Sequence, residues 1–464
     1  MTATNPAERI EHDSLGEVRL PADALYGPQT QRAVDNFPVS GRPMPVAFID
    51  ALCRLKGACA RGNRQLGTLD TERADAIVAV VDQLVEGLAI GRFRDAFPVD
   101  VYQTGSGTSS NMNANEVIAQ LAGNAGVHPN DHVNMSQSSN DIVPSAIRVM
   151  SVLRVEQDML PALAQLETVL LGRAGELRDV VKTGRTHLMD ATPIRFDQVL
   201  EGYVEQLRGW RLSLEQARDR NLALPLGGTA VGTGLNAPQG FAQVSVEALN
   251  QSLERERSFS LLSQPAAGMS VQDDSLALSS ALRGIAAFLH KLANDLRWMN
   301  SGPLAGLGEI SLPALQPGSS IMPGKVNPVV PESVAMVAVQ IQGLDHAIAM
   351  AAQSGNFELN VMFPLVAANL DEMITLAANA SRLLADKAIA GFTVNRERIE
   401  RDLAANPILV TALNPVIGYE AGAAIAKRAY AEGRAVIDVA REMTDLDEAT
   451  LTDLLDPRRL TGEG

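Results

Sequence analysis

Residues Gln316–Pro328, QPGSSIMPGKVNP, have the composition of a binding loop rather than of a simple connection. Two Pro-Gly pairs break regular structure here, and glycine lets a backbone approach a ligand closely. The loop contains two hydroxyls, one cation and one amide but no acidic residue, namely Ser319, Ser320, Lys325 and Asn327. Hydrogen-bond donors and a positive charge without a competing acid suit a small anion.

The end of this loop has the pattern of a helix start. Asn327 followed by Pro328 predicts an N-cap residue with proline at the first helical position, and the apolar run from Val329 to Ile348 supplies the helix. Free backbone N–H groups and the positive end of the helix dipole would then face the loop. A structural connection whose serines and asparagine only cap turns is the alternative, which the complete string disfavours.

Three other loops place hydroxyl, amide or imidazole groups before a predicted helix. Each alone is more often an N-cap cluster than a site. Together they predict several anion-binding helix ends with few acidic competitors, which favours a ligand with more than one carboxylate. The three loops contain Ser106-Gly107-Thr108, Ser138-Ser139-Asn140, and Thr186-His187, the last before a helix expected to open at Thr192-Pro193.

Long helices are predicted to position these loops. Apolar residues alternate at spacings of four and three, the pattern of helices that pack at shallow angles. Five predicted helices of roughly 25–38 residues would each span about 40–55 Å, and one of them, at about 144–182, should bend near Pro161. The apolar series are Phe196, Leu200, Tyr203, Leu207, Trp210 and Leu214; Leu278, Leu282, Ile285, Leu289, Leu292 and Leu296; and Val334, Val337, Ile341, Leu344 and Ile348.

Changes in the residue pattern along the sequence predict three domains in a mainly all-α fold. Residues 1–141 form a mixed, mostly helical N-terminal domain, residues 142–393 a central five-helix bundle, and residues 394–464 a small C-terminal helical domain. The helix after Pro328 is apolar or small on nearly every face. Such a helix must be covered all round, so we expect its burial between subunits.

Composition excludes several classes of protein. The 464 residues are 46% hydrophobic, enough for a large core, and only 4% aromatic, which favours helices. A net charge of −15 disfavours nucleic acid or an anionic membrane as partner. We expect no membrane span, because no segment approaches eighteen apolar residues, and no signal peptide, hence a cytoplasmic protein. Cys53 and Cys59 are too few for an iron–sulfur cluster and are expected to be buried.

The sequence GSSIMPGKVNP resembles the signature loop of the fumarase/aspartase superfamily. From near Ile10 to the C-terminus, the chain resembles the class II fumarate hydratases. The strings GRTHLMDA, which contains His187, and TGSGT, at residues 104–108, are similar to the fumarase forms of two further motifs. Aspartate ammonia-lyases of the same superfamily typically have glutamine at the histidine position.

The resemblance implies reversible hydration of fumarate to (S)-malate, without a cofactor or a metal. It implies a homotetramer with a twenty-helix core, in which three subunits build each active site. Ser319 would be the base, although a neutral serine is a poor base, and His187, paired with Glu332, would protonate the departing hydroxyl. The implied substrate-binding residues are Ser106, Thr108, Ser138, Ser139, Asn140, Thr186, Ser320, Lys325 and Asn327.

Residues His128, Pro129, Asn130 and Asp131 match a second, non-catalytic dicarboxylate site of the family. Taken alone, the string is equally well read as a turn. Two other functions stay open. One is an aspartate ammonia-lyase, and the other is a helical oligomer kept as a structural protein, which should show a damaged signature loop or a lost His187.

Overall fold

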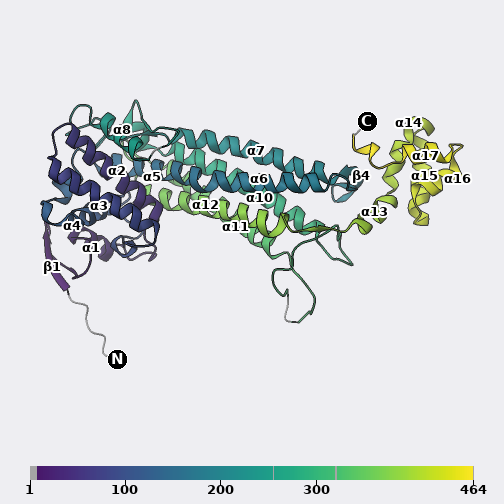
Figure 1. The fold of residues 1–464 in the computed structure, drawn as a ribbon, viewed down its shortest axis with the longest axis horizontal. Helices are drawn as coiled ribbons and strands as arrows, with labels where there is room; N and C mark the ends of the chain where they lie inside the picture. The colour runs from purple at the N-terminus through teal and green to yellow at the C-terminus, as the bar shows by residue number, and fades with distance from the viewer. Residues whose placement is uncertain (1–7, 254, 319–320, 463–464) are drawn as a thin grey trace. The chain divides into compact units, whose positions relative to one another are not determined.

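The computed structural model describes residues 8–253, 255–318 and 321–462, and the fold is mainly α-helical, as predicted (Figure 1). Ser319 and Ser320, two of the predicted site residues, lie outside the described residues. The helices are α1 Pro28–Asn36, α2 Val46–Gln65, α3 Thr71–Ala89, α4 Thr108–Leu121, α5 Ser139–Arg154, α6 Leu160–Glu176, α7 Phe196–Arg220, α8 Phe241–Leu253, α9 Pro265–Ser270, α10 Asp273–Met299, α11 Val329–Ala352, α12 Phe363–Leu384, α13 Arg396–Ala404, α14 Asn414–Ile417, α15 Tyr419–Glu432, α16 Val436–Met443 and α17 Glu448–Leu454.

The strands of the described residues form small two-stranded sheets that join loops rather than build a core. Three of the four pairs are antiparallel, and β5–β6 is parallel. The pairs are β1 Glu8–Asp13 with β2 Gly16–Pro21, β3 Val181–Thr186 with β4 Met189–Arg195, β5 Ala223–Leu224 with β6 Ser260–Leu261, and β7 Ile310–Ser311 with β8 Thr393–Val394.

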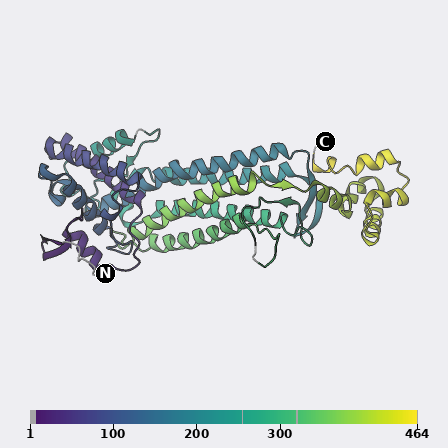
Figure 2. The same cartoon turned by 60° about the horizontal axis from the view of Figure 1, so that its bottom comes forward.

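The chain divides into two compact units. Unit 1 contains Met1–Leu160, Leu212–Gly284 and Val339–Ala377, and unit 2 contains Pro161–Arg211, Ile285–Ala338 and Ala378–Gly464. Within unit 1, helices α1 to α5 pack against one another (Figure 1). Within unit 2, helices α14 to α17 lie together in the views of both figures (Figures 1 and 2), and α13 and α15–α17 contribute to an apolar core of their own. The three-domain division at residues 141 and 393 stays a prediction.

The five long helices are present at nearly the predicted positions. Most residues of the predicted apolar series are buried, with side chains such as Leu200 and Leu282 almost inaccessible. Polar contacts also join neighbouring helices within each unit. In unit 1, Ser279 of α10 donates to Asp345 of α11 at 2.7 Å.

The predicted bend near Pro161 takes the form of a π-helical turn, η4, at Val155–Met159 between α5 and α6. Pro161 has no N–H group for the carbonyl four residues earlier, and a wider turn accommodates that loss. The helix ends at Glu176 rather than near residue 182 because β3 begins at Val181.

The helix expected to open at Thr192-Pro193 is not there, and this prediction was wrong. Both residues lie in β4, which pairs with β3. Pro193 is tolerated because the strand pairing is irregular at this point, between Thr183 and Arg185. Helix α7 begins at Phe196, directly after the strand.

The expectation that no segment could cross a membrane was too strict. Helices α10 and α11 are both long and apolar enough to meet a length and composition test for a span. In α10, 61% of the most apolar window is buried inside the protein, which is typical of a core helix. In α11 the corresponding share is 39%, and Met336 and Val339 are exposed, so part of this helix has no cover within one chain.

Candidate active site

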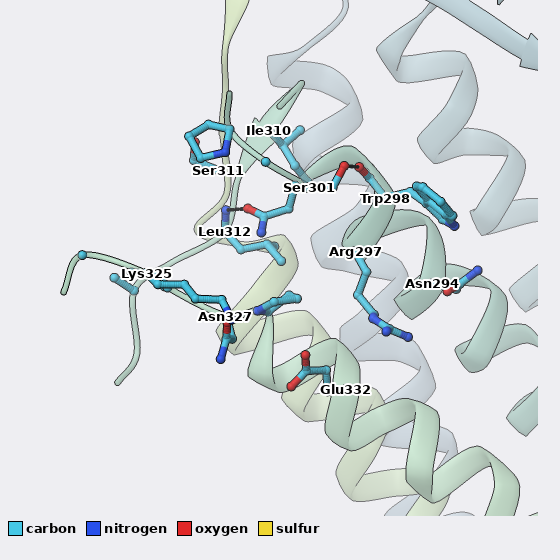
Figure 3. Close-up of a pocket in the computed structure, with 17 residues that line it drawn as sticks. Asn294, Arg297, Trp298, Ser301, Ile310, Ser311, Leu312, Lys325, Asn327 and Glu332 are labelled. Atoms are coloured by element: carbon cyan, nitrogen blue, oxygen red, sulfur yellow. Dashed lines mark hydrogen bonds between the residues drawn. The ribbon is translucent and has the colours of Figure 1, made fainter. Parts of the chain in front are cut away.

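Lys325, Asn327 and Glu332 line one pocket of unit 2, with a volume of about 630 Å³ (Figure 3). Helix α10 forms the facing wall and supplies Arg297, whose guanidinium group extends toward the side of the pocket where Glu332 lies (Figure 3). Lys325 and Arg297 are two cations against the single carboxylate of Glu332. The lining therefore has a net positive charge and suits an anion.

The ends of the signature loop are held together by its own residues. The side-chain amide of Asn327 donates to the carbonyl oxygen of Gly318 at 2.9 Å. A Cβ atom on Gly318 would lie only 2.0 Å from the carbonyl oxygen of Lys325. The backbone at Gly318 and at Lys325 is therefore so close that only glycine fits at position 318. Asn327 was expected to cap α11. Its amide closes the loop instead, and the backbone N–H of Glu332 bonds to the carbonyl of Pro328 to start the helix.

His187 lies in the tight turn of the β3–β4 hairpin. Because Thr186 pairs with Met189, the turn consists of His187 and Leu188 alone, with φ angles of 58° and 61°. Two left-handed residues define the hairpin turn that usually requires Asn-Gly, and non-glycine residues held there each cost about 1–3 kcal/mol. The surrounding structure must therefore hold this turn, which presents His187 at its exposed tip.

A buried ionic cluster fixes the base of this hairpin. Glu309 is only 4% exposed and accepts from Arg185 at 2.5 Å and from Lys182 at 3.2 Å. Burial lowers the pKa of Lys182, and the nearby Glu309 carboxylate opposes that effect. The backbone of Glu309 is hydrogen-bonded to the backbone of Met299 and of Asn395. These bonds fix the position of Glu309, so its carboxylate anchors the hairpin. Glu309 lies outside every motif of the sequence and was therefore not predicted as part of the site.

His187 and Glu332 line different pockets of the described chain. The His187 pocket, of about 650 Å³, is lined by residues of the hairpin, α7 and α10, including Lys182, Tyr203 and Lys291. Burial raises the pKa of Tyr203, whose hydroxyl donates to Asp295 at 2.5 Å. A single chain therefore does not place Glu332 beside His187.

The other predicted hydroxyl loops meet in unit 1. Ser106 and Thr108 exchange a hydrogen bond of 2.9 Å at the start of α4, and Asn111 of α4 donates to Ser139 at the start of α5 at 3.0 Å. Gly107 has a φ of 74°, and a Cβ atom there would lie 2.7 Å from Val143 of α5. The two helix N-termini, and their hydroxyls, are therefore adjacent.

A capping box begins α5 and joins it to the glycine string at 227–234. The Ser138 side chain accepts from the N–H of Asn140, and Asp141 accepts from the N–H of Ser138 at 2.9 Å. Asp141 also accepts from the N–H groups of Gly227 and Thr229 at 2.9 and 3.0 Å. The glycine string is thus held at the start of α5.

The predicted second site forms a π-helical turn, η3, at Pro129–Val133. His128 precedes it and accepts from the N–H of Asp131 at 3.2 Å, so its imidazole acts as a cap. The adjoining pocket, of about 710 Å³, is lined by His128, Pro129 and Asn130 and also by three carboxylates, Glu11, Asp13 and Glu116. An anion there would face repulsion from these acids.

Cys53 and Cys59 are free and buried, as expected. Among the described residues, no cluster of three or more His, Cys, Asp or Glu side chains is arranged to hold a metal ion.

Comparison with known proteins assigns the family. Residues 16–343 match a family described as Lyase, and residues 409–462 match one described as Fumarase C C-terminus. The protein named "Fumarate hydratase class II 2" of Pseudomonas aeruginosa is 57% identical, over 98% of this chain and 99% of its own length. The chain belongs to the class II fumarate hydratase family. A "Fumarate hydratase class II" of Mycobacterium tuberculosis is 51% identical over 92% of this chain and 90% of its own.

Solved structures agree with this family. A recombinant class II fumarase from Schistosoma mansoni matches with a TM-score of 0.93 and 36% identity, over 98% of this chain and 99% of its own. A structure titled "fumarate lyase:delta crystallin from Brucella melitensis bound to cobalt" matches with a TM-score of 0.92 and 42% identity, over 98% of this chain and all of its own.

Proposed function

We propose that the protein is a fumarate hydratase that catalyses the reversible hydration of fumarate to (S)-malate. The observation that carries this proposal is the full-length similarity to class II fumarate hydratases, at up to 57% identity among the relatives given above. The retained His187 and the cationic pocket at Lys325 support it. Nothing in the described residues favours the ammonia-lyase or the structural oligomer.

The difficult step is removal of a proton from C3 of malate, which leaves a carbanion delocalised into the adjacent carboxylate. Lys325, Asn327 and the backbone N–H groups of the signature loop would stabilise the doubly negative carboxylate. Preorganised donors of this kind contribute about 3–4 kcal/mol each to the transition state. We assign Ser319 as the base that accepts the C3 proton, with the oxyanion form stabilised by the same loop.

His187 would then protonate the departing hydroxyl, which leaves as water, and Glu332 would hold the imidazole. Such acid–base help is worth roughly 10²–10⁴-fold. The remaining substrate contacts would come from Thr186 and Ser320 and from the unit 1 hydroxyls and amide, namely Ser106, Thr108, Ser138, Ser139 and Asn140.

We propose that these groups come together in a soluble, cytoplasmic homotetramer, with three subunits contributing to each site. Two features support a shared site. Leu188 and Met189, next to His187, are 68% and 69% exposed, and apolar side chains of α11 are exposed as well. A neighbouring subunit that covered both surfaces would bring Glu332 of one chain to His187 of another. Cross-linking or analytical ultracentrifugation would test the assembly.

We also propose that His128, Pro129, Asn130 and Asp131 bind a second dicarboxylate, weakly. Glu11, Asp13 and Glu116 line the adjoining pocket, so the affinity should be far below that of the catalytic site. A His128→Asn variant should keep its turnover and lose this weak binding, which calorimetry with succinate would detect.

Ultraviolet absorbance of fumarate gives a direct test of the function. The purified protein should consume fumarate in water and form malate without ammonium. Formation of aspartate only when ammonium is present would identify an ammonia-lyase instead, and a folded tetramer inactive in both assays would favour the structural alternative.

A further inference from the structure

Lys56, in the middle of α2, is a completely buried cation that the mechanism above does not use. Its ammonium group donates to the side-chain oxygens of Asn134 at 3.0 Å and of Gln137 at 2.9 Å. Within the described part of the chain, no carboxylate forms an ion pair with it. A buried charge without a counter-ion is expensive, so its retention calls for a reason beyond packing.

A chain of hydrogen bonds connects Lys56 to the entrance of α5. The Asn134 oxygen that accepts from Lys56 also accepts from the amides of Asn111 at 3.1 Å and Asn115 at 3.2 Å. The same amide nitrogen of Asn111 donates to the Ser139 hydroxyl at 3.0 Å. Asn111 and Asn115 are themselves buried on α4, so the connection is shielded from water.

We propose that Lys56 is a positioning residue for the substrate, which holds Ser139 through Asn134 and Asn111 and adds a buried positive charge beneath the N-terminus of α5. Ser139 is one of the hydroxyls assigned to the dicarboxylate, so this inference rests on the proposed function. The N-terminus of α5 already favours an anion through its dipole. A cation beneath it strengthens that preference in a region of low dielectric.

The groups that act electrostatically on Lys56 are few. Asp141 of α5 faces it from the neighbouring helix, and Cys53 and Cys59 lie on α2 itself. Burial raises the pKa of each thiol to about 12, so both are neutral at physiological pH. Burial raises the pKa of Asp141 to about 6. The hydrogen bonds that its carboxylate accepts from three backbone N–H groups oppose this rise. At the contacts described above, α4 contributes Asn111 and Asn115, which are uncharged.

This environment makes the charge of Lys56 responsive near neutrality. Burial lowers its pKa to about 7. Above that pH the free enzyme loses the positive charge and keeps the negative charge of Asp141, which opposes an incoming diacid. Bound dicarboxylate favours the charged ammonium and raises its pKa, so binding takes up a proton. The affinity is therefore highest below about pH 7 and falls above it, by about tenfold in total once Lys56 has lost its proton.

Steady-state kinetics of fumarate hydration from about pH 6 to about pH 9 test this inference. A Lys56→Met variant keeps an unbranched side chain, shorter by one atom, and removes the charge. At low pH we expect a KM about tenfold higher than in the natural protein, a kcat within about twofold, and no further rise in KM above about pH 7. Lys56→Gln keeps a donor without the charge, and it should lose the pH dependence of KM equally.

Cys53→Ala is the matched control, because it alters a buried neutral side chain on the same helix. Its KM should keep the pH profile of the natural protein. Parallel KM profiles for Lys56→Gln and the natural protein would overturn the role of the charge. A loss confined to kcat, with KM unchanged, would also contradict a role in substrate binding.

Calorimetry on the natural protein keeps the inference testable if these variants do not fold. Succinate, a dicarboxylate that cannot be hydrated, is titrated at about pH 7.5 in two buffers of different ionisation enthalpy. Binding should take up a fraction of a proton, and an enthalpy independent of the buffer would refute the coupling. Inactivity of the natural protein toward fumarate would overturn the proposed function, whereas the proton uptake would still report on Lys56.

Discussion

Replacing Glu309 with glutamine would remove the carboxylate that joins the His187 hairpin to the rest of unit 2. Glu309 accepts from Arg185 at 2.5 Å and from Lys182 at 3.2 Å, and the Lys182 side chain is only 7% exposed. Removing one partner of a buried ion pair costs about 3–5 kcal/mol, because the other charge is left without compensation. Arg185 keeps 19% of its side chain in solvent, so we expect the lower end, about 3 kcal/mol.

The pH dependence gives this prediction a sign. Lys182 has a pKa lowered by burial, and the loss of Glu309 lowers it further. The unfolded chain then binds more protons at Lys182 than the folded one does, so the stability of the variant rises with pH up to about 10, the ordinary lysine pKa. The deficit relative to the natural protein should therefore be largest near neutrality and shrink as the pH increases.

Both tryptophans, Trp210 and Trp298, lie in unit 2, so their fluorescence follows its unfolding in urea. Glu167→Gln is a matched control in the same unit. Glu167 also accepts from two arginines, each at 2.7 Å, but these are 47% and 35% exposed, so the loss should be below about 1 kcal/mol and independent of pH. Equal losses for the two variants would refute the argument that burial of the cluster holds the hairpin.

Three further predictions concern the site itself. Ser319→Ala and His187→Asn should each lower kcat by at least about 10²-fold without lowering urea stability, and a near-normal rate for either variant would remove that residue from the proposed chemistry. Arg297→Met should raise KM for fumarate by about tenfold, because it removes one of two cations of the pocket, whereas an unchanged KM would show that the substrate does not feel this charge. Leu188→Gly should stabilise the hairpin by about 1 kcal/mol, since Leu188 has a φ of 61°, and any loss of stability would contradict the strain assigned to the turn.

The long helices could be predicted because their signal is local and repetitive. Residues such as Leu200 and Leu282 recur at helical spacing and are buried accordingly. The β3–β4 hairpin could not be found in this way, because Thr192-Pro193 has the chemistry of a helix start and His187-Leu188 contains neither glycine nor asparagine. Backbone pairing with β3, the preceding strand, decides the conformation there.

For the site as well, residues within short motifs could be proposed from the sequence, whereas supporting residues far away in sequence could not. The donors at Thr108, Ser138 and Lys325 belong to short strings with a recognisable composition. The residues that support the loops and the His187 hairpin belong to no such string. Lys56 and Glu309 lie far in sequence from the loops that they contact, and each resembles an ordinary surface charge until the fold shows that it is buried. Sequence patterns therefore propose groups that would face a ligand, but they give no sign of buried charges such as Lys56 and Glu309.

An acidic protein that binds a diacid needs a positive electrostatic potential at its binding site despite its negative net charge. Charges on the surface are screened over about 8 Å at physiological ionic strength, so most of the net −15 contributes little inside a pocket. Buried groups are screened much less. The proposed binding of a dicarboxylate therefore depends on local charges within each unit, namely Lys56 and the dipoles of α4 and α5 in unit 1, and the pair Arg297 and Lys325 in unit 2. Added salt should accordingly change KM less than the loss of any one of these cations, and a KM that rises steeply with ionic strength would show that long-range attraction matters more than this local arrangement.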